Sequence, residues 1–287
     1  MKTVKKESPQ SSQSSKVVSR MNVSPVENGK TFVFIFDCQD GNPNGDPKMQ
    51  NSPRTKPDNH IWVSSESQKR KIRNRWEQDG RDIFISVGDG LNSKIKKLPG
   101  TSEEEKNEAL SATYIDVRIF GAVANTGELN SVKAGVVHGP VQIYDATSIN
   151  IPTIELVQTT RLVATKEDNS HTMGTRYKVN YAAFKGSGSI SAVRAAKVNM
   201  TEEDEKVFWS ALLEMFHDHA SNSSGIQRLR KVFVFEGRGK SMDIGIALDA
   251  VKTSVKVPAE EVSSFEDIEV ALDLTKIPDG VTVTELL

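Results

Sequence analysis

The sequence predicts an α+β fold built on a ferredoxin-like sheet that carries large insertions. The β-branched and aromatic run Thr31–Phe36 predicts a buried central strand. Residues 201–219 predict a long helix, because one face is apolar and Thr201 and Asp204 form a capping box. The predicted order is strand, helix, strand, hairpin, helix and strand. RNA-recognition motifs share this skeleton, but the pattern alone does not prove RNA binding.

The remaining elements follow from local patterns. A helix over 64–77 begins at Ser64 or Ser65, with Ile72 and Trp76 as an apolar i,i+4 pair. A short helix begins near Ser102, and the last forty residues predict short strands and turns. Strands are predicted at 81–87, 114–120, 141–145, 153–164, 176–184 and 228–235, and the runs on either side of the polar stretch 166–171 predict a hairpin.

Composition indicates an ordinary globular protein. The 287 residues are 37% hydrophobic and 26% charged, with a net charge of −1, so a nucleic-acid site has to be a local patch. Residues 1–29 predict a disordered tail that lacks the apolar core of a secretory signal. The single cysteine, Cys38, fits a small buried residue and a reducing, cytoplasmic setting, and no apolar run is long enough to span a membrane.

A loop rich in Gly, Pro, Asn and Asp occupies residues 39–60. At the offsets of a calcium-binding loop it has Asp40, Asn42, Asn44 and Gly45. The twelfth position is Asn51 instead of glutamate, and a strand precedes the loop. A turn held by its own side chains, able to present backbone N–H groups to phosphates, is the favoured interpretation.

The helix over 64–77 carries five cations in seven positions, from Lys69 to Arg75. No carboxylate interleaves with them, so we expect an outward basic face that contacts phosphates, with Arg54 and Lys56 adding charge upstream. A solvated surface helix is the alternative.

Other motifs are weak. His217 and His219 do not share a helix face, which argues against a metal pair. Residues 239–241 lack the first glycine of a P-loop, and residues 186–191 lack the third glycine of a dinucleotide loop. The carboxylates Asp37, Asp40, Asp46 and Asp116 could cluster, but the sequence does not bring them together.

Several segments together resemble a known family. They are the strand Thr31–Phe36 with the loop that follows it, Pro53-Arg54-Thr55, the basic helix, Asp116–Ala122, His138–Gln142, Thr172-Met173-Gly174 and the helix after Glu202. This ordered set, over roughly residues 30–237, resembles the CRISPR-associated backbone subunit of type I Cascade, the Cas-seven family, in its type I-C and I-B branch. His138 stands where that family leads us to expect arginine.

The resemblance implies a modified RNA-recognition-motif palm over 30–287, with a fingers insertion at about 47–113 and a β-hairpin thumb at about 155–180. It implies a non-catalytic subunit of antiviral defence, without metal or cofactor, that polymerises head to tail along the crRNA guide. Target DNA would pair with the guide, so base pairing reads the sequence while the protein holds the backbone. The other implied partners are the cap, guide-processing and large subunits of Cascade.

The resemblance also implies the RNA-binding residues. Lys69, Arg70 and Arg73 would hold guide phosphates, while Gly139 and Gln142 would line the RNA-facing palm. The loop and thumb would contribute Asn42, Asn44, Gly45, Arg54, Arg161, Arg176 and, as a candidate wedge between bases, Met173.

Two alternatives stay open at this point. One is a metal-dependent ribonuclease of a related CRISPR effector, using Asp37, Asp40 or Asp46. The other is a calcium-binding interaction module, which calcium would stabilise without RNA.

Overall fold

Three long antiparallel strands form the centre of the structure, a computed structural model that describes residues 24–88, 90–124, 135–160, 173–239 and 241–287. Strand β1 (Lys30–Gly41) lies between β10 (Met173–Ile190) and β11 (Ile226–Glu236). The sheet runs in the order β14-β11-β1-β10-β8-β4, and β7 and β9 also pair with β10. The shorter strands are β4 (Trp62–Val63), β7 (Val141–Ile143), β8 (Ala146–Ser148), β9 (Ile154–Thr160) and β14 (Thr282–Glu285).

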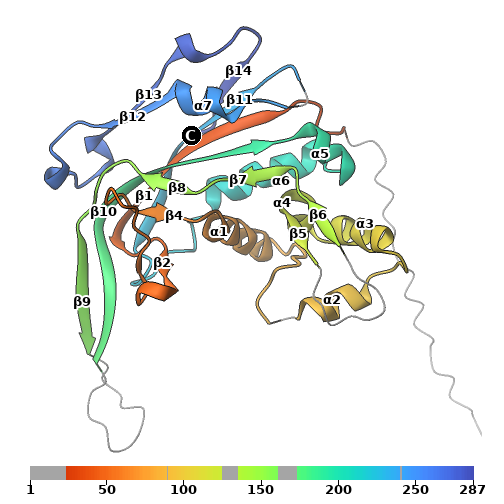
Figure 1. Cartoon of the computed structure of the whole chain (residues 1–287), viewed down its shortest axis with the longest axis horizontal. Helices are drawn as coiled ribbons and strands as arrows, with labels where there is room; N and C mark the ends of the chain where they lie inside the picture. The colour runs from red at the N-terminus through yellow and green to blue at the C-terminus, as the bar shows by residue number, and fades with distance from the viewer. Residues whose placement is uncertain (1–23, 89, 125–134, 161–172, 240) are drawn as a thin grey trace, which may run out of the picture.

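Helices cover one face of this sheet (Figure 1). The side chains of Phe32, Phe34 and Phe36 alternate along β1 and are fully buried on this side. Phe32 packs at 5.7 Å from the ring of Phe208 on α6 (Glu202–Glu214), and Trp76 of α1 (Ser65–Gln78) belongs to the same core. The predicted central strand, the helix after it and the later long helix are therefore confirmed.

Glycines on β10 make room for the aromatic rings of β1. Gly186 faces Phe34 and Gly188 faces Phe32 across the ladder. A methyl group at Gly186 would lie 2.4 Å from Phe34 Cζ, and one at Gly188 would lie 2.2 Å from Phe32 Cζ. The alternating glycines and serines that begin at Gly186 therefore belong to a strand packed against aromatic rings. They do not form a dinucleotide-binding loop, which the sequence had indicated only weakly.

The opposite face of the sheet is covered by the C-terminal segment. Val33 and Ile35 of β1 point to this side and are buried with Phe233 and Phe235 of β11. The cover consists of α7 (Ile244–Ala250), β12 (Val251–Val255) and β13 (Ile268–Leu272), which lie above the sheet in Figure 1. The sequence predicted only strands and turns here, so the helix α7 was missed.

The predicted strand over 114–120 is wrong, because Ile115–Phe120 form the helix α4. All six residues are buried, so the apolar run has no exposed face from which a period could be read. Two of them make ion pairs: Arg73 Nε donates to Asp116 Oδ2 at 2.9 Å, and Arg118 Nη2 donates to Asp204 Oδ1 at 2.8 Å. These contacts join α4 to α1 and to the first turn of α6.

The remaining elements are short. Helices α2 (Leu91–Lys97) and α3 (Glu103–Thr113) precede α4, and the pair β5 (Gly121–Val123) and β6 (Val136–His138) follows it. The other elements are β2 (Gly45–Asp46), β3 (Ser52–Pro53), α5 (Ala192–Lys197) and the 3-10 turns η1 (Pro47–Met49), η2 (Ala259–Glu261), η3 (Phe265–Asp267) and η4 (Leu274–Lys276).

Helix starts were predicted well from their capping residues. Ser64 caps α1 by accepting from Ser67 N–H, and the predicted start near Ser102 is a complete capping box with Glu105. The box of Thr201 and Asp204 is also present, but α6 ends at Glu214 instead of 219. The predicted strand at 81–87 is wrong: this stretch has no regular structure, because side chains take several of its backbone groups.

Residues 24–29 pack on the body of the protein, whereas the sequence placed them in the N-terminal tail. Val26 is buried, and Pro25 forms an isolated antiparallel β-bridge with Thr201. Glu202 N–H donates to the carbonyl of Ser24 at 3.0 Å. Residues 1–23 lie outside the described part of the chain.

The predicted hairpin is present at its base. Strand β9 pairs with the first half of β10, from Ile154 opposite Val179 to Thr160 opposite Met173. Arg161 and the predicted tip at 166–171 lie outside the described residues. In the described chain, no helix is both long and apolar enough to cross a membrane.

Arg118→Ala should destabilise the fold strongly. The variant leaves Asp204 and the carbonyl of Ser111 without their buried donor, which is expected to cost about 3–5 kcal/mol of unfolding free energy. Urea denaturation followed by circular dichroism measures this loss. Lys206→Ala is the control, since its pair with Glu203 is exposed and should contribute less than about 0.5 kcal/mol. Equal midpoints for the two variants would contradict the structural role of α4.

Candidate nucleic-acid interface

A polar hollow of about 330 Å³ lies where the loop after β1 meets the base of the β9–β10 hairpin. It brings together three residues that the sequence singled out separately: Asn42, Gly45 and Arg176. The other lining residues, which the sequence analysis missed, are Gln50, Asn51, Thr175, Tyr177, Ser221, Ser223 and Ser224. Amides, hydroxyls, one guanidinium and one aromatic ring thus face a common space.

The loop is held by its own side chains, as predicted. Asn42 Nδ2 donates to the carbonyl of Asn51 at 2.6 Å, and Asn42 N–H donates to the carbonyl of Ser223 at 2.8 Å. Gln50 and Asn51 adopt positive φ values of 52° and 63°. A Cβ at Gly45 would lie 2.0 Å from Asn51 Oδ1 and 2.9 Å from the Asn51 carbonyl oxygen, so Asn51 would have to shift to admit a side chain there.

Two polar atoms of the hollow residues are buried yet have no hydrogen-bond partner within the described chain, Asn42 Oδ1 and Arg176 Nε. Arg176 Nη1 donates to the carbonyl of Asn222, so the guanidinium lies beside the turn that contains Ser221, Ser223 and Ser224. Two residues that line the hollow thus each carry an unpaired polar atom, one an acceptor and one a donor.

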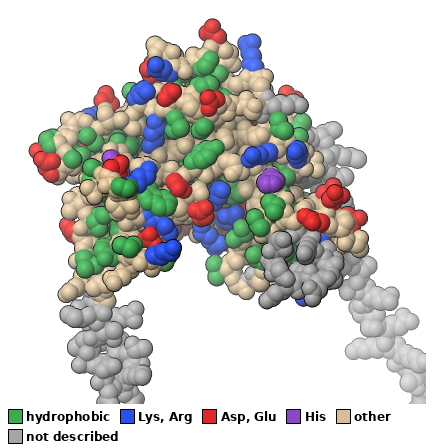
Figure 2. All heavy atoms as spheres, in the orientation of Figure 1, with side chains coloured by type: hydrophobic (Ala, Val, Ile, Leu, Met, Phe, Trp, Pro, Cys, Tyr) green, Lys and Arg blue, Asp and Glu red, His purple; other side chains and the backbone are tan. Residues whose placement is uncertain are grey.

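Asn44 connects this hollow to the basic helix. Its Oδ1 accepts from Ser64 N–H at 2.9 Å, at the N-cap of α1, and its carbonyl accepts from Arg54 N–H at 3.2 Å. The Arg54 guanidinium stacks 5.1 Å from the ring of Trp62 and lies 3.9 Å from Asp46. The loop and α1 therefore form one connected surface, and Figure 2 shows Lys and Arg side chains along the recess beneath α1.

The cations of α1 are less free than the sequence predicted. Arg73 is 7% exposed and pairs with Asp116, and Arg75 pairs with Asp79 and Glu214 at 2.8 Å and 3.0 Å. The expectation of an outward basic face is wrong for Arg73 and Arg75, since Asp116 of α4 and Glu214 of α6 pair with them. Lys69 and Arg70 remain partly exposed, and burial together with the charge of Arg73 lowers the pKa of Lys69.

Lys71 points inward instead of outward. It is 4% exposed, donates to Ser67 Oγ at 3.0 Å, and lies 5.9 Å from the ring centre of Phe216. Burial lowers its pKa to about 8. The nearby Cys38 is fully buried, as predicted, and burial followed by the charge of Asp37 raises its pKa to about 12. Burial and the charge of Lys71 lower the pKa of His219 to about 4.

Gly139 follows β6 and Gln142 lies on β7, and neither lines the hollow. Gly139 is buried against the end of α4, where a Cβ would lie 2.1 Å from the Phe120 carbonyl carbon, so packing alone accounts for this glycine. Gln142 Nε2 donates to the carbonyl of Gly139 at 3.0 Å. Of the thumb candidates, Met173 begins β10, and Arg161 lies outside the described residues.

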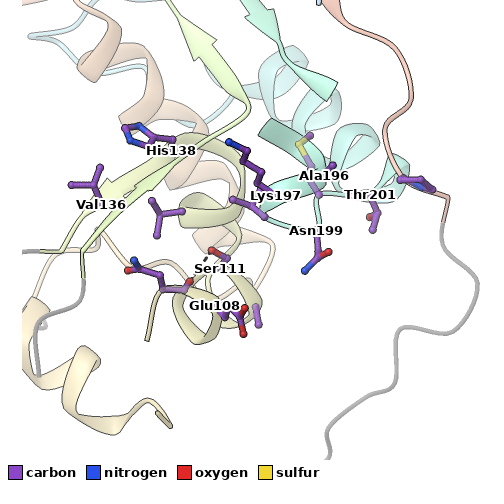
Figure 3. Close-up of a pocket in the computed structure, with 14 residues that line it drawn as sticks. Glu108, Ser111, Val136, His138, Ala196, Lys197, Asn199 and Thr201 are labelled. Atoms are coloured by element: carbon purple, nitrogen blue, oxygen red, sulfur yellow. Dashed lines mark hydrogen bonds between the residues drawn. The ribbon is translucent and has the colours of Figure 1, made fainter. Parts of the chain in front are cut away.

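A second cavity, of about 870 Å³, lies between α3, β6 and the segment that leads into α6 (Figure 3). His138, which stands where we expected arginine, is exposed at one edge of the cavity, and Lys197, Asn199 and Glu108 also line it. No local pattern predicts this cavity, because its walls come from segments far apart in the chain.

The carboxylates of the nuclease alternative are separately engaged. Asp37 accepts from Tyr181 Oη at 2.9 Å and from Arg230 Nε at 2.8 Å, and burial and the Asp37 charge raise the pKa of Tyr181. Asp40 pairs with Lys178 at 2.7 Å. Within the described ranges, no three His, Cys, Asp or Glu side chains are placed to hold a metal ion. Two residues at the calcium-loop offsets are bonded within the chain, Asn42 to the Asn51 carbonyl and Asn44 to Ser64 N–H.

Comparison with known proteins decides the family. The family model described as CRISPR-associated protein Cas7 matches residues 28–273. The chain belongs to the Cas7 family. A CRISPR-associated protein Cas7 of Haloferax volcanii is 26% identical over 219 residues, which is 64% of this chain and 64% of that relative. The match therefore spans less than two thirds of the relative's length.

Two solved structures are similar to this Cas7 chain at low identity. A chain of a CRISPR RNA-guided surveillance complex in a pre-nicking state is 15% identical, with a TM-score of 0.48 over 72% of this chain and 78% of that one. A chain of a second CRISPR RNA-guided surveillance complex is 18% identical, with a TM-score of 0.41 over 71% and 68%. Scores this low do not by themselves establish a shared fold.

Lys71→Met should remove a pH dependence from the stability of the protein. Between the folded pKa of about 8 and the ordinary value of 10.5, the unfolded chain holds the proton that folded Lys71 has released. The free energy of unfolding therefore rises with pH across this window, by up to about 3 kcal/mol from Lys71. Below pH 8 both states are protonated and this contribution does not change.

The difference in unfolding free energy between wild type and Lys71→Met, measured by urea titration from pH 7.5 to 10, isolates this one group from others that titrate there. We expect the difference to change in favour of wild type as the pH rises. Parallel pH profiles would show that Lys71 is not held in the buried, unfavourable position described.

Proposed function

We propose that this Cas7-family chain is a non-catalytic backbone subunit of a type I CRISPR Cascade, of the I-C or I-B branch, that binds the crRNA guide. The observation that supports this most directly is the connected surface from Arg176 through Asn44 to Lys69 and Arg70. It combines cations with amide and hydroxyl groups, the chemistry that holds a nucleic-acid backbone without reading its sequence.

Burial of both sheet faces supports an RNA path along this surface. An RNA-recognition motif stacks bases on the open face of its sheet. Here Val33, Ile35, Phe233 and Phe235 occupy the face opposite the helices, and the C-terminal segment covers them. In the proposed function the RNA follows the recess beneath α1 and the base of the hairpin instead.

The architecture of the proposed subunit follows the family. The sheet serves as the palm, residues of about 47–113 serve as the fingers, and the β9–β10 hairpin serves as the thumb. Copies of the chain stack head to tail along the guide in the cytoplasm, target DNA pairs with the exposed guide, and cap, processing and large subunits complete the complex. Arg73 has an internal role in this proposal, since Asp116 already neutralises it.

The engaged state of Asp37 and Asp40 supports a non-catalytic role over a ribonuclease. A metal-dependent cut needs carboxylates free to bind the ion. Asp37 is 2% exposed and bonded to Tyr181 and Arg230, so its oxygens serve the fold.

Lys69→Ala and Arg176→Ala test the proposal by binding of single-stranded RNA over a range of salt concentrations. Each removed phosphate contact should lower the slope of log K against log salt by about 0.7, and the loss of affinity should not depend on sequence. Lys206→Ala is the matched control, because its side chain is exposed on α6 at 73%. If both variants show the same slope of log K against log salt as wild type, the RNA does not contact Lys69 or Arg176.

A further inference from the structure

Residues 79–88, which follow α1, contain no helix or strand, yet a buried cation holds this segment. Lys94 of α2 is 7% exposed. Its Nζ donates to the carbonyls of Ile83 at 2.8 Å and Phe84 at 3.0 Å, and to Ser86 Oγ. Three acceptors from four successive residues converge on one ammonium group, so this segment is fixed from the side of α2.

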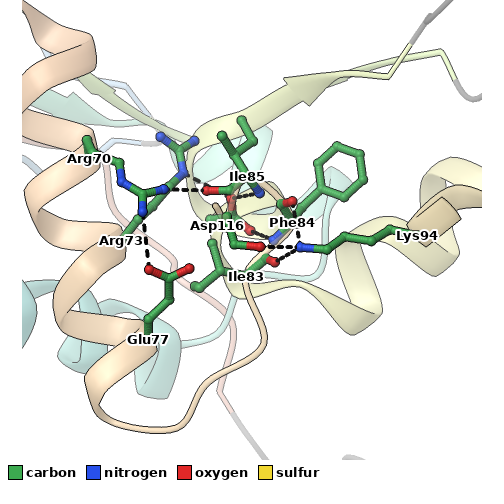
Figure 4. A network of polar contacts seen from close by, with 9 residues as sticks. Arg70, Arg73, Glu77, Ile83, Phe84, Ile85, Lys94 and Asp116 are labelled. Atoms are coloured by element: carbon green, nitrogen blue, oxygen red, sulfur yellow. Dashed lines mark hydrogen bonds and ion pairs between the residues drawn. The ribbon is translucent and has the colours of Figure 1, made fainter. Parts of the chain in front are cut away.

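A buried carboxylate holds the same segment from the other side (Figure 4). Asp116 is fully buried and accepts from Phe84 N–H at 2.8 Å and Ile85 N–H at 3.1 Å, while Arg73 supplies its counter-charge. The loop backbone is thus bonded through both its carbonyl and its N–H groups. Burying the charges of Lys94, Arg73 and Asp116 costs free energy of desolvation. Lys94 and Asp116 bond the loop backbone directly, and Arg73 neutralises Asp116.

The residues held in this way end in an exposed apolar tip. Ile83 and Phe84 are buried, but Ile85 is 39% exposed and Val87 is 86% exposed. Arg70 of α1 lies beside them, because its Nη1 donates to the carbonyl of Ile85 at 2.8 Å and its Nη2 lies 3.3 Å from Glu77 Oε2. A partly exposed guanidinium and two exposed apolar side chains therefore share one fixed element.

We propose that Arg70, Ile85 and Val87 form a preformed contact site for one nucleotide of single-stranded RNA. Arg70 binds a phosphate oxygen, and Ile85 and Val87 pack against the ribose and the face of the adjoining base. Lys94 and Asp116 are positioning residues that hold the loop in place before RNA arrives. This inference rests on the proposed RNA-binding function and adds residues that the sequence did not indicate.

Charge and size favour RNA over a protein partner. Arg70 places a cation next to the tip, 3.3 Å from one carboxylate, Glu77, and its side chain stays partly exposed, which suits a polyanion. Two apolar side chains are far less than the roughly 800 Å² per partner that a stable protein interface buries. Unpaired bases, by contrast, offer flat apolar faces that pack on single side chains.

The test compares Val87→Ser with Arg70→Ala in the full-length protein, using a labelled single-stranded RNA over a range of salt concentrations. Val87→Ser should weaken binding about fivefold with an unchanged salt slope, because it removes an apolar contact. Arg70→Ala should weaken binding and lower the slope by about 0.7. Val255→Ser, on the C-terminal cover, is the matched control and should bind as wild type does.

The outcomes separate this inference from the proposed function. If wild type binds RNA and Val87→Ser binds equally well with the same slope, the nucleotide site is wrong while the RNA-binding function stands. If wild type does not bind RNA at all, the proposed function itself fails.

The positioning role of Lys94 has its own readout. In a Lys94→Met background the tip is no longer fixed, so Val87→Ser should cost much less than fivefold, a coupling that a merely structural role would not produce. Ser86→Ala, which removes one of the three acceptors of Lys94, serves the same purpose should Lys94→Met not fold. Full additivity in both backgrounds would overturn the positioning role.

Discussion

The buried ion pairs of the short helix α4 hold together three parts of the chain that are distant in sequence. Asp116 binds Arg73 on α1 and two N–H groups of the loop after it, and Arg118 binds Asp204 at the start of α6. Burial alone would raise the pKa of Asp204, but the hydrogen bond and charge of Arg118 outweigh it and the pKa lies below its usual value. The helix layer on the sheet depends on these charges being paired, because an unpaired buried charge is strongly destabilising.

The same pairs decide which cations of α1 are available to a ligand. Arg73 is buried against Asp116, Arg75 pairs with two carboxylates, and Lys71 is buried. Lys69 and Arg70 remain partly exposed, Arg70 with one carboxylate, Glu77, at 3.3 Å. Together with the covered sheet faces, this restricts the proposed RNA path to the recess beneath α1, the hollow at the hairpin base and the loop tip at Val87. A family-level likeness alone would not distinguish between these five cations.

Local signals in the sequence were sufficient for much of the fold. Strand β1, the caps of α1, α3 and α6, the hairpin pairing and the self-bonded loop all follow from short-range patterns. The helix α4 was mistaken for a strand because every residue in it is buried. The site was harder to predict, because its contacts join residues that are distant in the sequence. Asp116 and Arg73 are 43 residues apart, and Arg176 and its partner Asn222 are 46 residues apart. No local rule predicts which carboxylate reaches a given cation.

Guide binding is tested most directly by purifying the protein after expression alone and after co-expression with a CRISPR array and its guide-processing subunit. Size-exclusion chromatography with light scattering, the ratio of absorbance at the nucleic-acid and protein maxima, and digestion with RNase or DNase together identify any bound species. Co-expression should yield a large assembly containing RNA of uniform length, which RNase but not DNase destroys. A nucleic-acid-free monomer under both conditions would contradict guide binding.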